Sequence, residues 1–243
     1  ISEKYWNSKG EEVETREEAE AAEPPSEEPS ETPNALSDAD LERLLEEAVD
    51  YDSLEERDDL HYQTNESEPY SGWVKLMYDS GQVKGLTQVK DGKAADGIIT
   101  EWHENGQKKR EGTVKDGELD GLQTTWHVNG QKSEEATYKE GKEDGLTTKW
   151  HENGQKGGEQ RWKGGKRDGH YIVWWPNGQR RGEGTYKENW SDGVSSAWYE
   201  NGQKEREGTF KDGKEHGIAT QWYENGQKWD EVIYKDGKAD GLY

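Results

Sequence analysis

Apolar and polar residues alternate with a period of two in short runs that fill most of the chain. In residues 121–127, Leu122, Thr124 and Trp126 are predicted to point to one side. A second run, over residues 132–139, places Ala136 and Tyr138 in one register. Such runs, separated by Asn-Gly and Asp-Gly pairs, are typical of β-hairpins. The pattern therefore predicts units of two strands and two turns.

The units repeat with a fixed period. Six tryptophans lie 24 residues apart, and each is followed four residues later by a glycine that comes after an asparagine. These are Trp102, Trp126, Trp150, Trp174, Trp198 and Trp222. A period of this length indicates a repeat architecture in which each unit packs against its neighbours. We expect an all-β fold, an elongated single-layer ribbon or solenoid of about seven 24-residue hairpins, about 65 Å long at the usual strand spacing.

The type of the Asn-Gly turn decides which residues share a face. A two-residue turn would place Trp102 and Val114 on opposite sides of the sheet. A three-residue loop that ends in a left-handed glycine pairs His103 with Gln107 instead. Under that pairing one face collects Trp102, Thr100, Ile98, Gly112 and Val114. Since this choice gathers the apolar residues, it predicts a type I turn with a glycine bulge.

Aromatic rings are expected to replace an aliphatic core. Leu, Ile, Val and Phe total only 29 of 243 residues and the net charge is −22, values that otherwise indicate disorder. The chain has 12 Trp and 12 Tyr. The second strands add a further row, Tyr138, Trp162, Tyr186, Phe210 and Tyr234. Both rows are predicted to interlock on one face as a structural ladder.

Three segments divide the chain. Residues 1–36 are predicted to be an acidic, largely disordered leader, residues 37–69 a short amphipathic helix with an acidic connector, and residues 70–243 the hairpin repeats. Ser37 is the predicted N-cap, and Leu41, Leu44 and Leu45 begin an apolar stripe that continues to Ala48 and Val49. The stripe either caps the first repeat or recruits a partner.

Charge is concentrated at the beginning of the chain. Residues 1–69 hold 24 Asp and Glu but only 5 Lys and Arg, which leaves a net charge of −3 for the rest. Such a segment repels nucleic acid, and we expect no nucleic-acid partner. No apolar run approaches the roughly 18 residues that span a bilayer, so we expect no membrane insertion. The chain begins at Ile1 and not Met, which leaves both a cytoplasmic and an extracytoplasmic location open.

Repeated polar residues do not form a predicted reaction site. His103, His127 and His151 occupy equivalent positions about 9.6 Å apart, too far for one metal ion to join two of them. The Asp-Gly pairs are explained by turn chemistry rather than calcium binding. Glu111 and its equivalents are expected to pair with lysines across strands. We therefore predict no enzyme activity, no cofactor and no metal site.

Some apolar residues depart from the repeat pattern and are candidates for contact with a partner. The tryptophans outside the main ladder are Trp73, Trp175, Trp190 and Trp229. An exposed tryptophan is a frequent anchor of protein interfaces. The helix residues Leu41, Leu44 and Leu45 are candidates of the same kind.

The unit W-[HY]-x-N-G-Q-K resembles the bacterial MORN-repeat variant. Residues 102–108, 198–204 and 222–228 show it most clearly, and the array over 70–243 looks like the YwqK-family antitoxins. Met77 stands where the first tryptophan is expected, and His216 where an aspartate is expected. The resemblance implies an elongated hairpin ribbon that binds protein, with some members neutralising a toxin. MORN repeats elsewhere are associated with membranes, dimerisation and scaffolding.

Two functions follow as hypotheses. The first is a non-enzymatic protein-binding repeat protein of the antitoxin or immunity type, which neutralises a partner by binding; a basic toxin would be attracted by residues 10–69. The alternative is a structural or envelope-associated scaffold that self-assembles through open sheet ends, since the chain stops at Tyr243 within a unit.

Overall fold

The computed structural model describes residues 5–6, 12–13 and 36–242, which fall into two units, Ile1–Ala35 and Leu36–Tyr243. In the first unit, β1 (Tyr5–Trp6) pairs antiparallel with β2 (Glu12–Val13). The rest of the predicted acidic leader lies outside the described residues.

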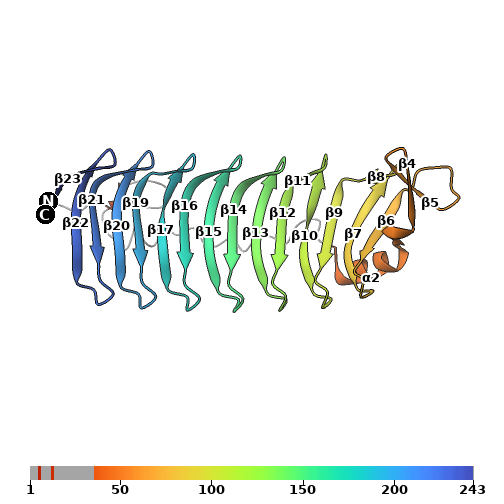
Figure 1. Ribbon diagram of the computed structural model, residues 1–243, viewed down its shortest axis with the longest axis horizontal. Helices are drawn as coiled ribbons and strands as arrows, with labels where there is room; N and C mark the ends of the chain where they lie inside the picture. Colours follow the sequence, from red (N-terminus) through yellow and green to blue (C-terminus); the bar gives the residue numbers. More distant parts are fainter. Residues whose placement is uncertain (1–4, 7–11, 14–35, 243) are drawn as a thin grey trace. The chain divides into compact units, whose positions relative to one another are not determined.

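The second unit is dominated by one long sheet (Figure 1). Its longer strands are β6 (Gly72–Met77), β7 (Val83–Lys90), β9 (Gly97–Trp102), β10 (Lys108–Lys115), β12 (Gly121–Trp126), β13 (Lys132–Lys139), β14 (Lys142–Trp150), β15 (Lys156–Lys163), β16 (Lys166–Trp174), β17 (Arg180–Lys187), β19 (Gly193–Trp198), β20 (Lys204–Lys211), β21 (Lys214–Trp222), β22 (Lys228–Lys235) and β23 (Lys238–Leu242). The shorter strands are β3 (Val49–Asp50), β8 (Lys93–Ala94), β11 (Glu118–Leu119) and β18 (Trp190–Ser191).

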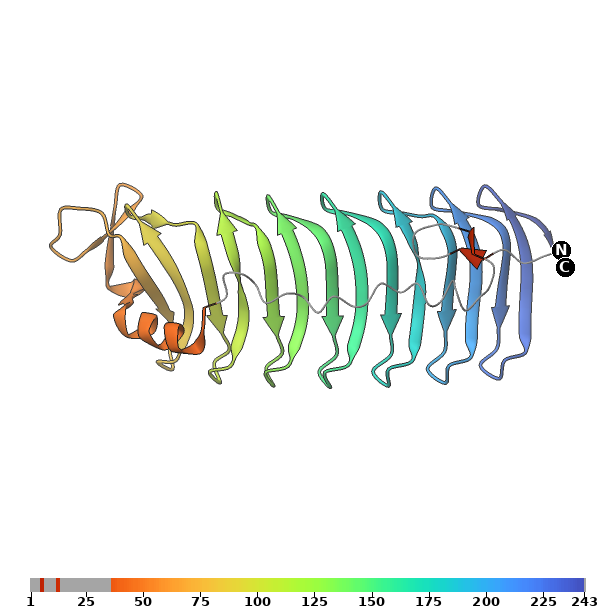
Figure 2. The ribbon, with the colours of Figure 1, turned by 180° about the vertical axis from the view of Figure 1, so that it is seen from behind.

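Consecutive strands form seven antiparallel hairpins closed by Asn-Gly or Ser-Gly loops, from β6–β7 to β21–β22. Each hairpin also pairs with the next, so the sheet grows along the chain into an elongated ribbon (Figures 1 and 2). The predicted all-β repeat fold, with units of about 24 residues, is confirmed.

The Asn-Gly turn has the predicted form. The His103 N–H donates to the Gln107 carbonyl at 2.8 Å, and the Gly106 N–H donates to the His103 carbonyl at 2.9 Å. Gly106 adopts a left-handed φ of 85°, which glycine accepts without steric cost. The three-residue loop that ends in a left-handed glycine is therefore correct.

The predicted shared face is wrong, because each hairpin contains a second irregularity. Lys108 pairs with Trp102 but Arg110 pairs with Glu101, so Lys109 is an extra residue in the second strand. One extra residue turns the rest of a strand over, since side chains alternate with a period of two. Thr100 consequently pairs with Glu111, while Gly112 and Val114 lie on the opposite face. The same shift occurs in all seven hairpins.

The two aromatic rows therefore lie on different sides of the sheet. We call the side that carries Trp102, Trp126, Trp150, Trp174, Trp198 and Trp222 the Trp face, and the side that carries Tyr138, Trp162, Tyr186, Phe210 and Tyr234 the Tyr face. Within one row, equivalent residues are two strands, about 9.6 Å, apart. The rings of the two rows cannot interlock, so the prediction of one shared aromatic ladder on one face is wrong.

Helix α2 (Asp38–Glu47) packs on the Trp face of the first hairpin. Ser37 is the N-cap, and its hydroxyl oxygen accepts the Asp40 N–H at 3.1 Å. Leu41 and Leu44 are buried in a cluster with Leu86 and Trp102. The helix ends at Glu47, before the end of the predicted apolar stripe at Val49, because Val49 and Asp50 form β3 and pair parallel with β6.

The helix explains why the first hairpin departs from the repeat. Leu86 stands where later hairpins have a glutamate, and it is only 2% exposed beneath the helix. Lys75, at the position of Thr100, donates from Nζ to the Leu45 carbonyl at 3.1 Å. Met77 occupies the place of a ladder tryptophan in this same hairpin.

The predicted connector is structured. It contains the 3₁₀ turn η1 (Tyr51–Ser53) and a hairpin of β4 (Leu54–Arg57) and β5 (Leu60–Gln63). The His61 N–H donates to the Gly92 carbonyl at 3.0 Å, which ties the connector to the first repeat. Within the described residues no helix is long and apolar enough to span a bilayer.

Candidate interaction surface

Two rows of loops form the long edges of the ribbon (Figure 1). We call the row of Asn-Gly loops, residues 103–107 and their equivalents, the Asn-Gly edge. The other row consists of the turns that begin at Asp91, Asp116, Glu140, Gly164, Glu188, Asp212 and Asp236, and we call it the tip edge. The two edges differ in how the hairpins are joined.

Along the Asn-Gly edge, the side chain that follows each ladder tryptophan reaches the next repeat. His103 Nε2 lies 2.9 Å from the Trp126 carbonyl. Trp175 Nε1 donates to the Trp198 carbonyl at 3.0 Å, and Tyr199 Oη donates to the Trp222 carbonyl at 2.9 Å. Histidine, tryptophan and tyrosine all occur here because each can present a ring N–H or O–H at this reach. The three equivalent histidines are thus part of a longer ladder of donors.

The asparagines of this edge perform two tasks. Asn153 Oδ1 accepts the Gln155 N–H at 3.0 Å and closes its own loop. Asn153 Nδ2 donates to the Pro176 carbonyl at 2.7 Å in the next loop. The corresponding bonds recur at Asn105, Asn129, Asn177 and Asn201. Five of the six junctions on this edge are therefore fixed by the same asparagine contacts, and the first junction has the bond from Tyr78 Oη to the Trp102 carbonyl.

The Trp face carries a ladder of ion pairs. Lys156 Nζ lies 2.6 Å from Glu159, and Lys228 Nζ lies 2.6 Å from Glu231. The two partners are three residues apart on one strand, because the bulge brings both side chains to the same face. The prediction that these glutamates pair with lysines across strands is therefore wrong. Hydrogen bonds from Lys228 and Thr220 hold the pKa of Glu231 below its usual value.

Lysines of this ladder also lie over aromatic rings. Lys108 Nζ is 6.0 Å from the centre of the Trp126 ring, and Lys132 Nζ is 5.9 Å from the centre of the Trp150 ring. A cation at this distance from a tryptophan face is attracted electrostatically. The lysines of the Trp face therefore have partners within the ribbon, both glutamates and tryptophan rings.

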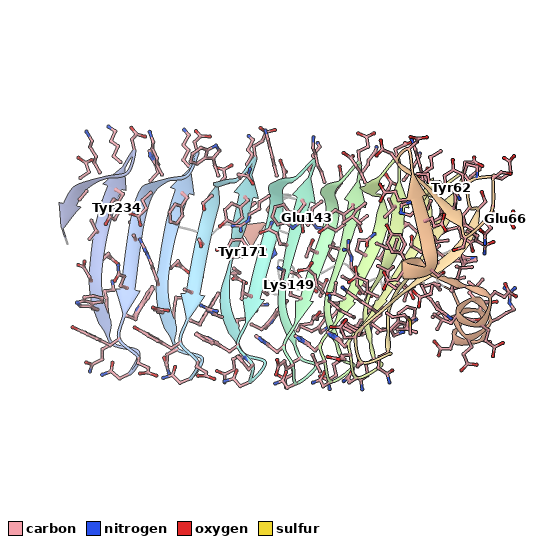
Figure 3. All side chains as sticks on the ribbon, turned by 45° about the vertical axis from the view of Figure 1, so that its right-hand side comes forward. Tyr62, Glu66, Glu143, Lys149, Tyr171 and Tyr234 are labelled. Carbon is pink, nitrogen blue, oxygen red and sulfur yellow. The ribbon has the colours of Figure 1, made fainter. Side chains whose placement is uncertain are left out.

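The Tyr face carries charged as well as aromatic side chains, among them Lys149, Tyr171 and Tyr234 (Figure 3). Lys149 Nζ lies 2.8 Å from Glu134 on the neighbouring strand. Tyr171 packs against Tyr186, with ring centres 5.1 Å apart. Burial, and then the charges of Glu143 and Glu134, raise the pKa of Tyr138.

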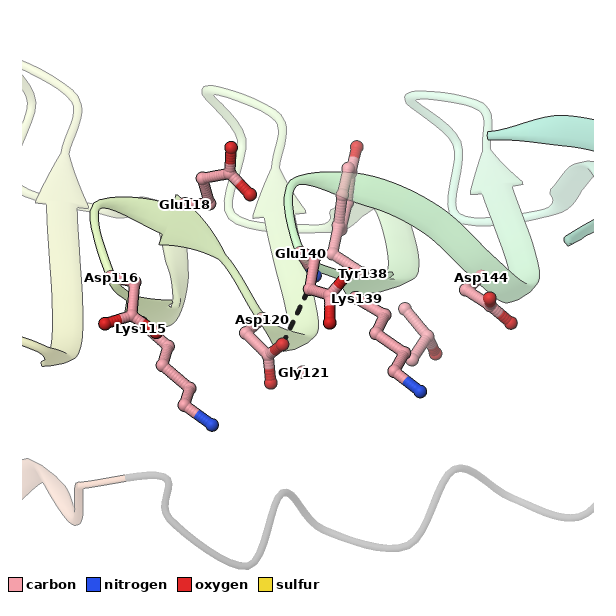
Figure 4. Close-up of a pocket in the computed structure, with 10 residues that line it drawn as sticks. Lys115, Asp116, Glu118, Asp120, Gly121, Tyr138, Lys139, Glu140 and Asp144 are labelled. Carbon is pink, nitrogen blue, oxygen red and sulfur yellow. Dashed lines mark hydrogen bonds between the residues drawn. The ribbon is translucent and has the colours of Figure 1, made fainter. Parts of the chain in front are cut away.

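A shallow pocket lies on the tip edge between the hairpins of residues 115–121 and 137–144 (Figure 4). Its charged lining mixes Lys115 and Lys139 with carboxylates that include Asp116 and Asp120. Asp120 Oδ2 accepts the Glu140 N–H at 3.3 Å, so this carboxylate serves as a link between turns. Within the described residues no group of three His, Cys, Asp or Glu is placed to hold a metal ion.

The candidate contact residues occupy three different environments. Leu41 and Leu44 are buried, and Leu45 and Trp73 pack partly buried against the same cluster. This geometry is that of a cap on the first repeat. Trp175 belongs to the donor ladder, and the Arg181 guanidinium lies 4.6 Å from its ring centre. These residues have structural contacts that the sequence did not show.

Trp190 and Trp229 instead project into solvent, with 62% and 60% of each residue exposed. Trp229 lies 5.8 Å from the Tyr223 ring, near the Asn-Gly edge. Trp190 lies on the tip edge, opposite Lys187. Sequence reasoning selected Trp190 but missed the lysines around it; the available signal was that other hairpins carry lysine at its position.

Five segments of the chain match the family model of the MORN repeat variant, namely residues 95–116, 119–140, 167–188, 191–212 and 215–236. MORN repeats are generally motifs that bind proteins or membranes. Residues 143–166 lie between two matched segments and contain β15 within a hairpin of the same register. No curated protein matches the chain.

Proposed function

We propose that this MORN-repeat chain is a non-enzymatic binding protein that holds a protein partner along its ribbon. The observation that supports this function is the rigid, repeated Asn-Gly edge combined with large side chains that the sheet leaves exposed. Rigid surfaces lose little conformational freedom on association, which favours affinity. Exposed tryptophans such as Trp190 are suited to anchor an interface.

In its more specific form, the proposal is an antitoxin-type protein that neutralises a basic toxin by covering its active surface. Residues 1–69 carry 24 Asp and Glu and only 5 Lys and Arg, a net charge of −19, of which residues 1–35 contribute −8. This acidic end would speed association with a basic protein at low salt. The resemblance to the YwqK-family antitoxins supports this form.

The test is reconstitution of a complex with a purified partner. A tagged full-length chain should retain a protein that re-forms a stoichiometric complex after both are purified separately. The absence of any such complex, with the chain itself sedimenting as concentration-dependent oligomers, would favour the self-assembling scaffold instead.

The toxin form has its own measurement. Removal of residues 1–35 should slow association with a basic partner and weaken the salt dependence of the rate, while α2 still covers Leu86. An unchanged rate would remove the leader from the mechanism. Removal of residues 1–69 is a poor test, because it would also uncover the buried cluster.

A further inference from the structure

We propose that the tip edge around Trp190 binds an acidic surface of the protein partner. The inference rests on the proposed protein-binding function and assigns both the place of contact and the chemistry of the partner. We call this surface the Trp190 edge, and it consists of Lys163, Lys166, Lys187, Trp190, Lys211 and Lys214.

The position of Trp190 is unusual for a tip. It is the first residue after the turn and pairs with Lys187. In five other hairpins lysine stands at this position, namely Lys93, Lys142, Lys166, Lys214 and Lys238. A turn of this kind does not require an aromatic residue, and 62% of Trp190 is exposed to solvent. The hairpin itself therefore gives no folding reason for tryptophan here.

The indole ring is nevertheless held in place. It lies against the next tip, where a side chain on Gly213 would collide with Trp190 Cε3. The turn beneath the ring is fixed to the preceding hairpin, since Asn189 Oδ1 accepts the Arg167 N–H at 2.7 Å and the Asn189 N–H donates to the Arg167 carbonyl at 2.9 Å. A ring that is already positioned loses little freedom on binding, as expected of an interface anchor.

Lysines occur on the tip of Trp190 and on the tips before and after it. Lys163 lies directly opposite Lys166, and Lys211 directly opposite Lys214. Like charges that face each other across strands are unfavourable. Glu188 already relieves this repulsion at Lys166, and a carboxylate from a partner would relieve it at Lys211 and Lys214.

Glu188 shows that the lysines of the Trp190 edge stabilise a nearby carboxylate. It lies 2.9 Å from Lys166 Nζ. The hydrogen bond and charge of Lys166, followed by the charges of Lys163 and Lys187, hold the pKa of Glu188 below its usual value. One carboxylate of this chain is thus already stabilised by three lysines of the Trp190 edge.

The three tips that carry these residues are slightly basic in an otherwise acidic protein. Residues 163–168, 187–192 and 211–216 contain 6 Lys and Arg and 5 Asp and Glu, a net charge of +1 within a chain of −22. Charge complementarity therefore favours an acidic surface of the partner at the Trp190 edge. The fitting surface is an apolar pocket for the indole with carboxylates on its rim.

Binding of displayed peptides to the full-length chain tests the proposal. A library of random peptides should yield binders that combine Asp or Glu with an apolar residue. The affinity of a selected peptide should fall about thirty-fold in Trp190→Lys, as expected for loss of a tryptophan anchor. Lys187→Glu should also weaken the same peptide. Trp190→Lys should fold, because lysine is native to this position in other hairpins.

Trp229→Lys is the matched control, since Trp229 is equally exposed and its equivalent in another hairpin is Lys109. It should leave the affinity unchanged. Selection of acidic peptides that bind Trp190→Lys as well as the native chain would overturn the proposed surface but leave protein binding intact. Binding only to anionic vesicles or oligonucleotides, with no peptide selected, would overturn both the contact with an acidic protein surface and the proposed function.

Discussion

The two long edges of the ribbon differ in uniformity. At the Asn-Gly edge, each interior loop repeats the same asparagine bonds, and the residue after tryptophan always supplies a donor. At the tip edge the turns vary, with Gly164, Asn189 and His216 replacing residues of the common pattern. Both edges join the hairpins, since backbone N–H groups of the tips also donate to carbonyls of the preceding hairpin, but only the tip edge varies between units, which favours it for recognition. In repeat proteins, residues that vary between units often carry the specific contacts.

Asn153→Ala should produce the largest loss of stability among single changes at the edges. It removes one bond within its loop and one bond to Pro176. The free energy of unfolding should fall by about 1–2 kcal/mol, measured by denaturant titration. Asp144→Ala on the tip edge removes a single 3.3 Å bond to the Gly164 N–H and should cost less. Equal losses would abolish the distinction between the edges.

His151 provides a test of the donor ladder. His151→Phe removes the donor to the Trp174 carbonyl and should lower the free energy of unfolding by about 1 kcal/mol. His151→Tyr should restore most of this stability, because Tyr199 makes the equivalent bond. Thermal unfolding of the three proteins decides the point; equal destabilisation by both changes would show that the imidazole acts by some other means.

Trp190→Lys should change the free energy of unfolding by less than about 0.5 kcal/mol, as expected for an exposed position. Chemical denaturation measures this. A large loss of stability would show that the indole serves to hold neighbouring tips together and would contradict its role as an anchor for a partner.

The smallest effect concerns pH. Because the folded-state pKa of Glu188 is lowered, its contribution to stability is present above the ordinary carboxyl pKa and is lost as the pH falls through the lowered value. Lys166→Gln should bring the pKa of Glu188 back toward its usual value, as followed by NMR titration of the side-chain carboxyl. No change would mean that the lysines of the Trp190 edge do not create a positive site.

Much of the fold could be predicted from the chain, because turn chemistry acts locally. The left-handed glycine after asparagine gave the correct pairing of His103 with Gln107. The bulge at Lys109 was missed, since a residue that adds one position to a strand looks like any other alternating residue. The spacing of Lys108 and Glu111 could have indicated the bulge, because two residues three apart on one strand lie on the same face only if the strand contains an extra residue.

The candidate surface was less predictable, because exposure depends on neighbours distant in sequence. Trp175 and Trp190 both depart from the ladder of tryptophans. Trp175 meets a carbonyl of the next repeat, whereas Trp190 meets solvent above Gly213. The sequence likewise left open whether Leu41 and Leu44 cap the first repeat or contact a partner. The structure shows a cap, because Leu86 lies beneath the helix in the same cluster.

The extra residue in each second strand has a consequence for how such arrays change in length. The extra residue places the aromatic side chain of the second strand on the face opposite the tryptophan of the first strand. Each added unit therefore adds one aromatic side chain to each face of the sheet. Gain or loss of a whole unit would extend or shorten the array without exchanging front and back. Deletion of the single residue Lys109 would instead turn Gly112 and Val114 to the other side, which makes the spacing within a unit less tolerant of change than the number of units.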